Sequence, residues 1–231
     1  MASLYDHTAA TVRRIYDRRI REAPLLDEGR YFPQARLFRE NWQAIRAEAL
    51  AVSADRLREI PRFHEIMPEQ APISANDGID WRMFTMKAYG TEVPEHLARC
   101  PVTAAVVARC PTVLSASFSL LAPGKHIPVH RGPFRGIVRF HMGLSMPHDE
   151  SGQLGAVLWV DGMPYYLDDG DTLLWDDTYP HEVLNATKDV RIALLLDVWR
   201  EGMPADMRML SSAIVGLVRA SMFFRAAPFT G

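Results

Sequence analysis

Histidine is the residue type in this 231-residue sequence whose placement most directly suggests chemistry. Of the eight histidines, His126, His130, His141 and His181 all lie in the half of the chain that is rich in predicted strands. Imidazole is the side chain that transition metals bind most often in proteins. A single histidine is more often a structural or surface residue than a metal ligand. His130 and His181 are too far apart to share a helix, so they can meet only where distant strands become neighbours, as at the mouth of a jelly-roll barrel.

Two arginines strengthen the interpretation of this region as a site. Arg139 and His141 are two residues apart in the run RFH, so in a strand their side chains share one face. Arg191 begins the apolar run RIALLLDVW, and an arginine at the start of a buried strand needs a partner. That partner is either a carboxylate of the chain or the carboxylate of a bound substrate or cofactor. The candidate carboxylates of the chain are Asp176, Asp177 and Asp197.

The segment that must position these residues is typical of antiparallel strands. From position 113 onward, short apolar runs alternate with turn residues, and Asp161-Gly162 predicts a tight hairpin. This pattern favours a β-sandwich or a jelly-roll barrel. The expected strands are Val113–Leu121, Gly136–Leu144, Ala156–Val160, Pro164–Leu167, Asp171–Trp175 and Val190–Trp199.

Helices are expected before and after the barrel. The periodicity of apolar residues predicts helices near the N-terminus, at 34–53, at 94–109 and at 206–225, with a long loop at 61–78 and a strand at 81–89. We therefore expect one domain over residues 1–231. Its parts are a helical and mixed region at 1–112, a jelly-roll core at 113–200 and a C-terminal helix at 201–231.

Composition excludes several classes of protein. Lys plus Arg is 26 and Asp plus Glu is 28, so the net charge of −2 argues against a nucleic-acid-binding protein. The two cysteines, Cys100 and Cys110, cannot form a disulfide framework, which favours a reducing compartment. The sequence has no apolar run long enough to span a membrane and no secretory signal. We expect a cytoplasmic protein, with peripheral contact at the inner membrane as a further option.

Two stretches resemble a known family, the aspartyl/asparaginyl β-hydroxylases. They are SLLAPGKHIPVHRGPFRGIVRFHMGL and LWDDTYPHEVLNATKDVRIALLLDVW. The resemblance covers about residues 100–200 and, more weakly, residues 32–89. It implies a mainly β fold with flanking helices around a cupin-like double-stranded β-helix. It also implies an Fe(II)-dependent dioxygenase that uses dioxygen and 2-oxoglutarate to hydroxylate an unactivated C–H bond.

The resemblance assigns the metal to two histidines. His130 and His181 match the iron-binding histidines of the family and are therefore the expected catalytic residues. Most related dioxygenases add a carboxylate two residues after the first histidine. Here that position is Gly132, and the family resembles this sequence in the same absence, with water in the third position. Two roles are open for Asp176 and Asp177. One of them could replace the missing carboxylate as a metal ligand, or they could orient His181 or its strand.

The resemblance also implies which residues bind 2-oxoglutarate. Arg191 matches the arginine that pairs with its distal carboxylate, and Ser119 matches a serine whose hydroxyl reaches the same group. Arg139 and His141 match residues that hold the near end of the oxo-acid.

The substrate stays open at this stage. The tripeptides His-Arg-Gly at 130–132 and His-Glu-Val at 181–183 look like the peptide-hydroxylase branch, which favours the β-carbon of an Asp or Asn residue. Residues 32–50 and 81–90 look like the lipid A hydroxylases of the same family, which favours an acyl chain. A free amino acid is a third candidate.

Other classes and partners complete the alternatives. A non-catalytic jelly-roll binding protein is disfavoured because both histidines, both arginines and Ser119 are present. A metal-dependent isomerase or hydrolase on a cupin-like barrel would need metal without 2-oxoglutarate. Aromatic residues beside the motifs fit either a pocket lining or plain core: Phe134, Phe140, Trp159, Trp175 and Tyr179. The terminal helices are expected to pack on the domain, with homodimer formation and membrane contact as alternatives.

Overall fold

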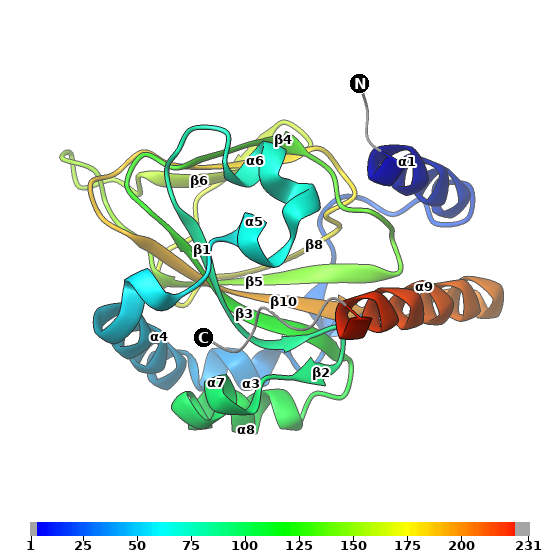
Figure 1. The fold of residues 1–231 in the computed structure, drawn as a ribbon, viewed down its shortest axis with the longest axis horizontal. Coiled ribbons are helices and arrows are strands. Elements are labelled where there is room, and N and C mark those ends of the chain that lie inside the picture. The colour runs from blue at the N-terminus through cyan, green and yellow to red at the C-terminus, as the bar shows by residue number, and fades with distance from the viewer. Residues whose placement is uncertain (1–3, 225–231) are drawn as a thin grey trace.

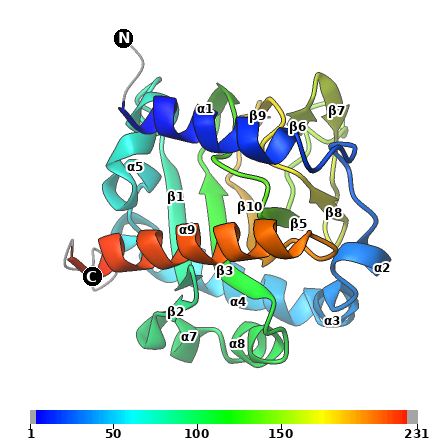
Figure 2. The ribbon, with the colours of Figure 1, turned by 90° about the vertical axis from the view of Figure 1, so that its right-hand side faces the viewer.

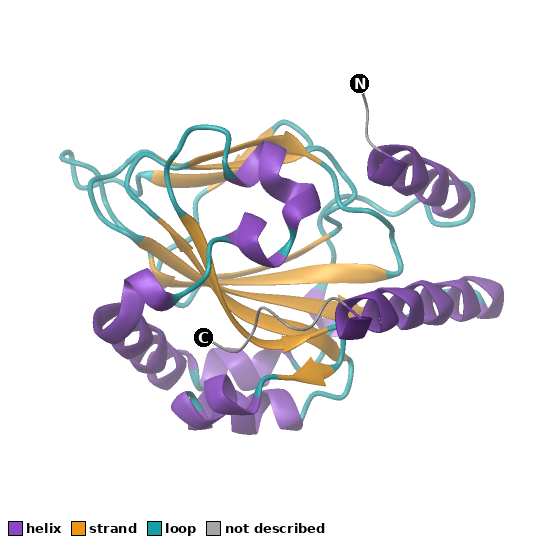
Figure 3. Ribbon diagram, viewed as in Figure 1, coloured by secondary structure: helices purple, strands orange, loops and turns teal. Residues whose placement is uncertain are grey.

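Two antiparallel sheets face each other and form a jelly-roll core, as Figures 1 and 3 show. The structure is a computed structural model that describes residues 4–224. The larger sheet has the strand order β2-β1-β3-β10-β5-β8, and the smaller has the order β4-β9-β6-β7. The strands are β1 (Trp81–Ala88), β2 (Thr91–Glu92), β3 (Val113–Leu121), β4 (His126–His130), β5 (Ile137–Ser145), β6 (Ala156–Val160), β7 (Met163–Tyr165), β8 (Thr172–Trp175), β9 (His181–Asn185) and β10 (Arg191–Trp199). The fold is therefore mainly β with flanking helices.

Most of the expected strands are confirmed, with small shifts at their ends. The six apolar runs form β3, β5, β6, β7, β8 and β10. Asp161 and Gly162 join β6 to β7 with φ angles of 51° and 79°, the left-handed pair that a tight hairpin requires. The strand expected at 81–89 is β1, and its pairing with β3 extends the larger sheet beyond the 113–200 segment.

Three strands were not predicted: the two-residue β2, and the strands β4 and β9 that carry His130 and His181. In β4 the sequence HIPVH contains Pro128, which hides the strand pattern but is tolerated because β4 is an edge strand. In β9 the inward-facing residues are His181, Val183 and Asn185, so polar side chains occupy positions where an apolar pattern would have been recognised.

Helices surround the core, and three expectations about them were wrong in detail. The single helix expected at 34–53 is two helices that meet at Asn41, and the one expected at 94–109 is interrupted before Pro101. The segment 61–78, expected as a loop, contains short helical turns. The helices are α1 (Leu4–Asp17), α2 (Glu28–Tyr31), α3 (Ala35–Glu40), α4 (Trp42–Arg56), η1 (Leu57–Glu59), α5 (Phe63–Ile66), η2 (Pro68–Gln70), α6 (Ala71–Ser74), α7 (Pro94–Arg99), α8 (Pro101–Ala108) and α9 (Ala205–Phe224).

The main hydrophobic core lies between the larger sheet and the helices that cover its outer face. Phe118 and Phe140 of the sheet are fully buried there with Phe32, Phe38 and Ile45 of the helical region. Because side chains alternate between the faces of a strand, the neighbours of these residues point toward the smaller sheet. The opposite face of the larger sheet is therefore free to build a site.

The terminal helices α1 and α9 lie side by side against one end of the barrel (Figure 2). The buried Tyr16 hydroxyl of α1 hydrogen-bonds Ser211 of α9 at 2.8 Å, so α1 packs on α9. Met209 and Leu217 of α9 remain 74% and 72% exposed. Among the described residues, no helix is long and apolar enough to cross a membrane.

Candidate active site

His130 and His181 meet across two strands of the smaller sheet. They are register partners on β4 and β9, and the centroids of their rings are 4.0 Å apart. The Nδ1 atom of each ring lies on a backbone carbonyl, that of Pro128 at 2.8 Å and that of Tyr179 at 2.9 Å. A carbonyl only accepts hydrogen bonds, so each Nδ1 carries the proton. The Nε2 lone pair of each ring is then available to a metal, the arrangement usual for metal-binding histidines.

The surroundings keep both rings neutral. Burial lowers the pKa of His130 to about 4, and the nearby Arg139 charge acts in the same direction. Burial also lowers the pKa of His181 well below its usual value, with His130 contributing. A neutral imidazole can donate its lone pair, so at neutral pH both rings are in the form that binds metal.

The loop that precedes His181 is held by a buried network of charges. The carboxylate of Asp176, which is fully buried, accepts hydrogen bonds from the backbone N–H of Thr178 at 3.0 Å and from its hydroxyl at 2.6 Å. Arg200 donates to the other oxygen of Asp176 and also to Glu22 in the N-terminal segment. Asp176 is thus engaged in fixing the loop that presents His181.

Arg191 is a buried arginine with no carboxylate partner among residues 4–224. It is 2% exposed, and burial lowers its pKa to about 10, so it stays charged at neutral pH. Its Nη2 lies against Nε2 of His141, while its Nε and the Nδ1 of His141 have no hydrogen-bond partner. Burial and the Arg191 charge lower the pKa of His141, so that ring is neutral beside the guanidinium. The ion pair considered from the sequence, between Arg191 and a nearby aspartate, is not formed.

Those aspartates pair with other arginines instead. Arg139 donates to Asp197 at 2.9 Å and lies 3.4 Å from Asp177. The positive charge of Arg139 is therefore neutralised by aspartates of the chain, whereas the positive charge of Arg191 has no carboxylate partner among the described residues.

All six residues that the sequence assigned to iron and 2-oxoglutarate line one cavity between the two sheets. The cavity holds about 370 Å³ of space not filled by atoms, including the part open to solvent. Its lining residues are Trp81, Ser119, Leu121, Ile127, His130, Arg139, His141, Leu158, Trp175, His181, Val183, Arg191 and Leu195. The geometry thus brings the predicted residues together from both sheets.

Sequence reasoning missed Trp81 as a site residue. Its indole N–H donates to the Ser119 hydroxyl at 3.0 Å, so it orients the serine expected to reach 2-oxoglutarate. Trp81 and Ser119 lie on the neighbouring strands β1 and β3, a proximity that no local pattern reveals. Of the aromatic residues considered beside the motifs, Trp175 lines the cavity, whereas Phe140 belongs to the core on the far face of the sheet.

The place of the missing carboxylate is occupied by another residue. A Cβ atom built on Gly132 would lie 2.1 Å from Oδ1 of Asp177, and the Gly132 N–H donates to the Asp177 carbonyl at 2.7 Å. Asp177 Oδ1 has no hydrogen-bond partner among the described residues, and burial raises the pKa of this carboxyl to about 6. Among those residues, no group of three or more His, Cys, Asp or Glu side chains could hold a metal ion.

This close approach gives a stability prediction. Replacing Gly132 with alanine is expected to lower the free energy of unfolding by about 1–3 kcal/mol, because the new methyl group overlaps the Asp177 carboxylate. Urea denaturation measures the change. The control is Gly216→Ala in α9, where nothing lies within 4 Å of the added Cβ and a gain of up to about 1 kcal/mol is expected. In the double variant Gly132→Ala/Asp177→Ala, the loss in free energy of unfolding should be smaller than the sum of the losses in the two single variants. Simple additivity would show that the overlap is not the cause.

Comparison with known proteins identifies the family to which this chain belongs. A sequence model described as aspartyl/asparaginyl beta-hydroxylase matches residues 39–201. The protein belongs to this family, as the two motif stretches suggested. The family model and the two relatives described next are named as hydroxylases.

Two curated relatives are informative. An ornithine lipid ester-linked acyl 2-hydroxylase from Rhizobium tropici is 31% identical over 194 residues, which are 84% of this chain and 66% of the relative. A human aspartyl/asparaginyl beta-hydroxylase is 26% identical over 179 residues, which are 75% of this chain and 22% of the relative. The chain therefore spans just under two thirds of the first relative and about a fifth of the second. Among solved structures, a predicted oxalate decarboxylase from Thermotoga maritima has a TM-score of 0.33 at 13% identity, covering 52% of this chain and 81% of its own.

Proposed function

We propose that this protein is an Fe(II)- and 2-oxoglutarate-dependent dioxygenase that hydroxylates an unactivated C–H bond. The observation that carries the proposal is Arg191, a buried guanidinium without a carboxylate partner among the described residues, in the same cavity as two neutral histidines. A buried charge without a counter-charge is costly unless a ligand supplies one. A dicarboxylate with a metal-binding end satisfies both features of the cavity.

The residues present suit iron. Each histidine directs its Nδ1 proton to a backbone carbonyl and leaves Nε2 free, which fixes the ring and the tautomer before a metal arrives. Imidazole ligands suit Fe(II) among several metals. His130 and His181 would therefore hold the iron, with Asp177 beside the position that lacks a protein ligand.

The other side chains of the cavity have distinct tasks. Arg191 would bind the distal carboxylate of 2-oxoglutarate, with the Ser119 hydroxyl, oriented by Trp81, as a second donor. His141 stays neutral beside Arg191 and leaves the guanidinium charge to the ligand. Trp175 and Leu158 exclude water from the cavity. Bound iron and 2-oxoglutarate would allow dioxygen, the oxidant, to hydroxylate the C–H bond, with succinate and carbon dioxide as the products of 2-oxoglutarate oxidation.

Two substrate classes follow from the relatives. The Rhizobium tropici relative covers more of this chain than the human one does, which supports an acyl chain as the group hydroxylated. A β-carbon of Asp or Asn in a peptide is the second candidate. We further propose cytoplasmic action at the inner membrane, where the exposed Met209 and Leu217 of α9 would contact lipid.

An anaerobic titration tests the proposed cofactors. Adding Fe(II) and then 2-oxoglutarate to the full chain without dioxygen should produce a visible charge-transfer band. Admitting dioxygen should then yield succinate. A metal-dependent isomerase or hydrolase would bind Fe(II) but show no band with 2-oxoglutarate, and a non-catalytic jelly roll would respond to neither. Either result would overturn the proposal.

A further inference from the structure

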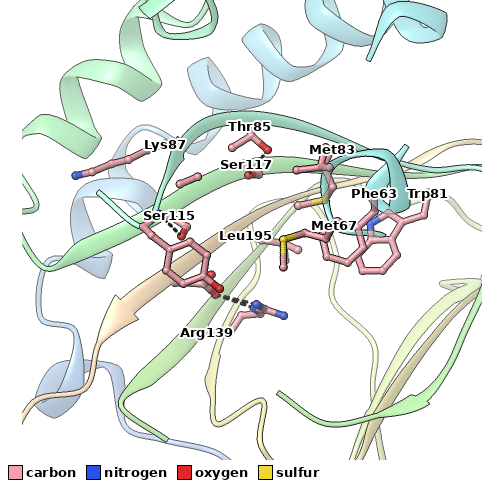
Figure 4. A pocket seen from close by; sticks show the side chains of 14 residues that line it. Phe63, Met67, Trp81, Met83, Thr85, Lys87, Ser115, Ser117, Arg139 and Leu195 are labelled. Atoms are coloured by element: carbon pink, nitrogen blue, oxygen red, sulfur yellow. Dashed lines mark hydrogen bonds and ion pairs between the residues drawn. The ribbon is translucent and has the colours of Figure 1, made fainter. Parts of the chain in front are cut away.

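A second, larger hollow adjoins the cavity of the candidate active site. It holds about 720 Å³ of space not filled by atoms, including the part open to solvent. Trp81, Arg139 and Leu195 line both hollows, so the two are contiguous. Figure 4 shows the larger hollow, with Lys87 at one end and Trp81 at the other. We call it the outer groove.

One wall of the outer groove is apolar and adaptable. Phe63, Ile66 and Met67 come from α5 and the turn that follows it, and Met83 stands opposite them on β1. Figure 4 places Met67 and Met83 between the two ends of the groove. Methionine side chains are flexible and polarisable, so such a wall suits an apolar chain of variable shape.

The floor of the groove contains hydroxyl groups that are already satisfied. Ser117 donates to the Thr85 hydroxyl at 3.1 Å, and Ser115 accepts from the Tyr89 N–H at 3.1 Å. Each of these hydroxyl groups already has one hydrogen-bond partner within the chain, which lowers the desolvation penalty of an apolar occupant at the floor. The small side chains of the floor leave room for the occupant.

Charge distinguishes one end of the groove. Arg139 and Asp197 neutralise each other at 2.9 Å. Lys87 makes no ion pair among residues 4–224, although exposed Glu92 is its register partner on β2. Of the charged residues that line the groove, Lys87 is thus the one without a counter-charge in the described part of the chain. An apolar wall that ends at a free cation is complementary to an amphiphile with an anionic group.

We propose that the outer groove binds an acyl amphiphile whose chain lies along Met67 and Met83 and whose anionic group pairs with Lys87. This inference rests on the proposed function, because it names the substrate class of the same site. Lys87 is then a specificity-determining residue: it selects a carboxylate or phosphate at one end of the substrate. An extended peptide is the occupant that the test must exclude.

Binding of defined amphiphiles to the full chain tests the proposal without turnover. The probes, used below their micelle concentrations, are N-dodecanoylglycine, its uncharged amide and the short-chain N-butanoylglycine. Calorimetry should show that dodecanoylglycine binds about 10- to 100-fold more tightly than its amide, as expected for a charge-assisted pair. Butanoylglycine should bind at least about tenfold more weakly than dodecanoylglycine, because it loses apolar contact.

Variants locate the anionic group. Lys87→Gln should weaken the binding of dodecanoylglycine about 10- to 100-fold and leave the affinity for its amide unchanged. The matched control is Lys188→Gln, a highly exposed lysine paired with Glu150, which should bind both probes as the natural chain does. Arg191→Met should also leave dodecanoylglycine binding unchanged. A loss there rather than at Lys87 would place the carboxylate in the inner cavity and overturn the proposal.

Other outcomes also overturn it: equal affinity for the acid and its amide, no binding of either, or tighter binding of an acidic peptide that contains an Asn residue. The anaerobic 2-oxoglutarate band is measured on the same Lys87→Gln protein. If the Lys87→Gln protein keeps the band but no longer binds dodecanoylglycine more tightly than its amide, Lys87 acts on the substrate and not on the cofactors. Absence of the band in the natural chain would disprove the proposed cofactors. The amphiphile affinities would still test the outer groove, because they are measured without turnover.

Discussion

Replacing His181 with alanine is expected to abolish succinate formation and to weaken Fe(II) binding by more than about 100-fold. The reason is that His181 would provide one of only two protein ligands, while removal even of an outer partner of a metal ligand costs roughly 10- to 100-fold in affinity. The same outcome is expected for His130→Ala. Anaerobic Fe(II) titration followed by metal analysis measures affinity, and succinate release measures activity.

A matched control comes from the same strand pair. His126 begins β4, pairs with half-buried Glu182 at 2.8 Å and lies outside the lining of the cavity. His126→Ala should retain iron binding and succinate formation, with a stability change below about 1 kcal/mol. Full iron affinity in the His181→Ala protein would disprove the ligand assignment, provided that circular dichroism shows the native fold.

The second large effect is expected at Arg191. Arg191→Met should weaken the binding of 2-oxoglutarate by about 2–5 kcal/mol, or roughly 30- to 4000-fold in affinity. The reason is that the variant removes the cation that would pair with the distal carboxylate. Without ligand, the same variant should be as stable as the natural chain or more stable. It replaces an uncompensated buried charge with an apolar side chain of similar length.

A contrasting arginine makes this result interpretable. Arg200 is equally buried, but it pairs with Asp176 and Glu22. Arg200→Met should lower the free energy of unfolding by about 3–5 kcal/mol, since it leaves a buried carboxylate without its partner. Thermal melts with and without 2-oxoglutarate measure both variants. An Arg191→Met protein that is destabilised like Arg200→Met and still stabilised by 2-oxoglutarate would mean that Arg191 is structural.

Local sequence patterns predicted those parts of the fold in which the chain repeats a simple rule. Short apolar runs bounded by turn residues located β3 and β10, and Asp161-Gly162 located a hairpin because both residues adopt positive φ. The rule failed where side chains serve the site: β9 directs His181 and Asn185 inward. The helical breaks were missed for different reasons. Pro101 was a visible signal, whereas Asn41 bonds the Leu37 carbonyl and ends its helix without a glycine or proline.

The candidate site was predictable in its membership but not in its charge balance. The resemblance assigned six residues, and all six line one cavity. It did not indicate that Arg139 is neutralised by Asp197 while Arg191 is left without a carboxylate. That distinction depends on pairing between strands β5 and β10, which places Arg139 opposite Asp197. It separates an arginine available to a ligand from one already engaged.

The sequence by itself determined the family, the jelly-roll class and the types of side chain available for chemistry, because these depend on motifs and short-range periodicity. Only the tertiary structure decided which charges meet. It set Asp177 into the space beside Gly132, oriented Ser119 through Trp81, and joined the inner cavity to the outer groove that ends at Lys87. Each of these depends on side chains brought together from separate strands, where burial makes an unpaired charge costly and therefore informative.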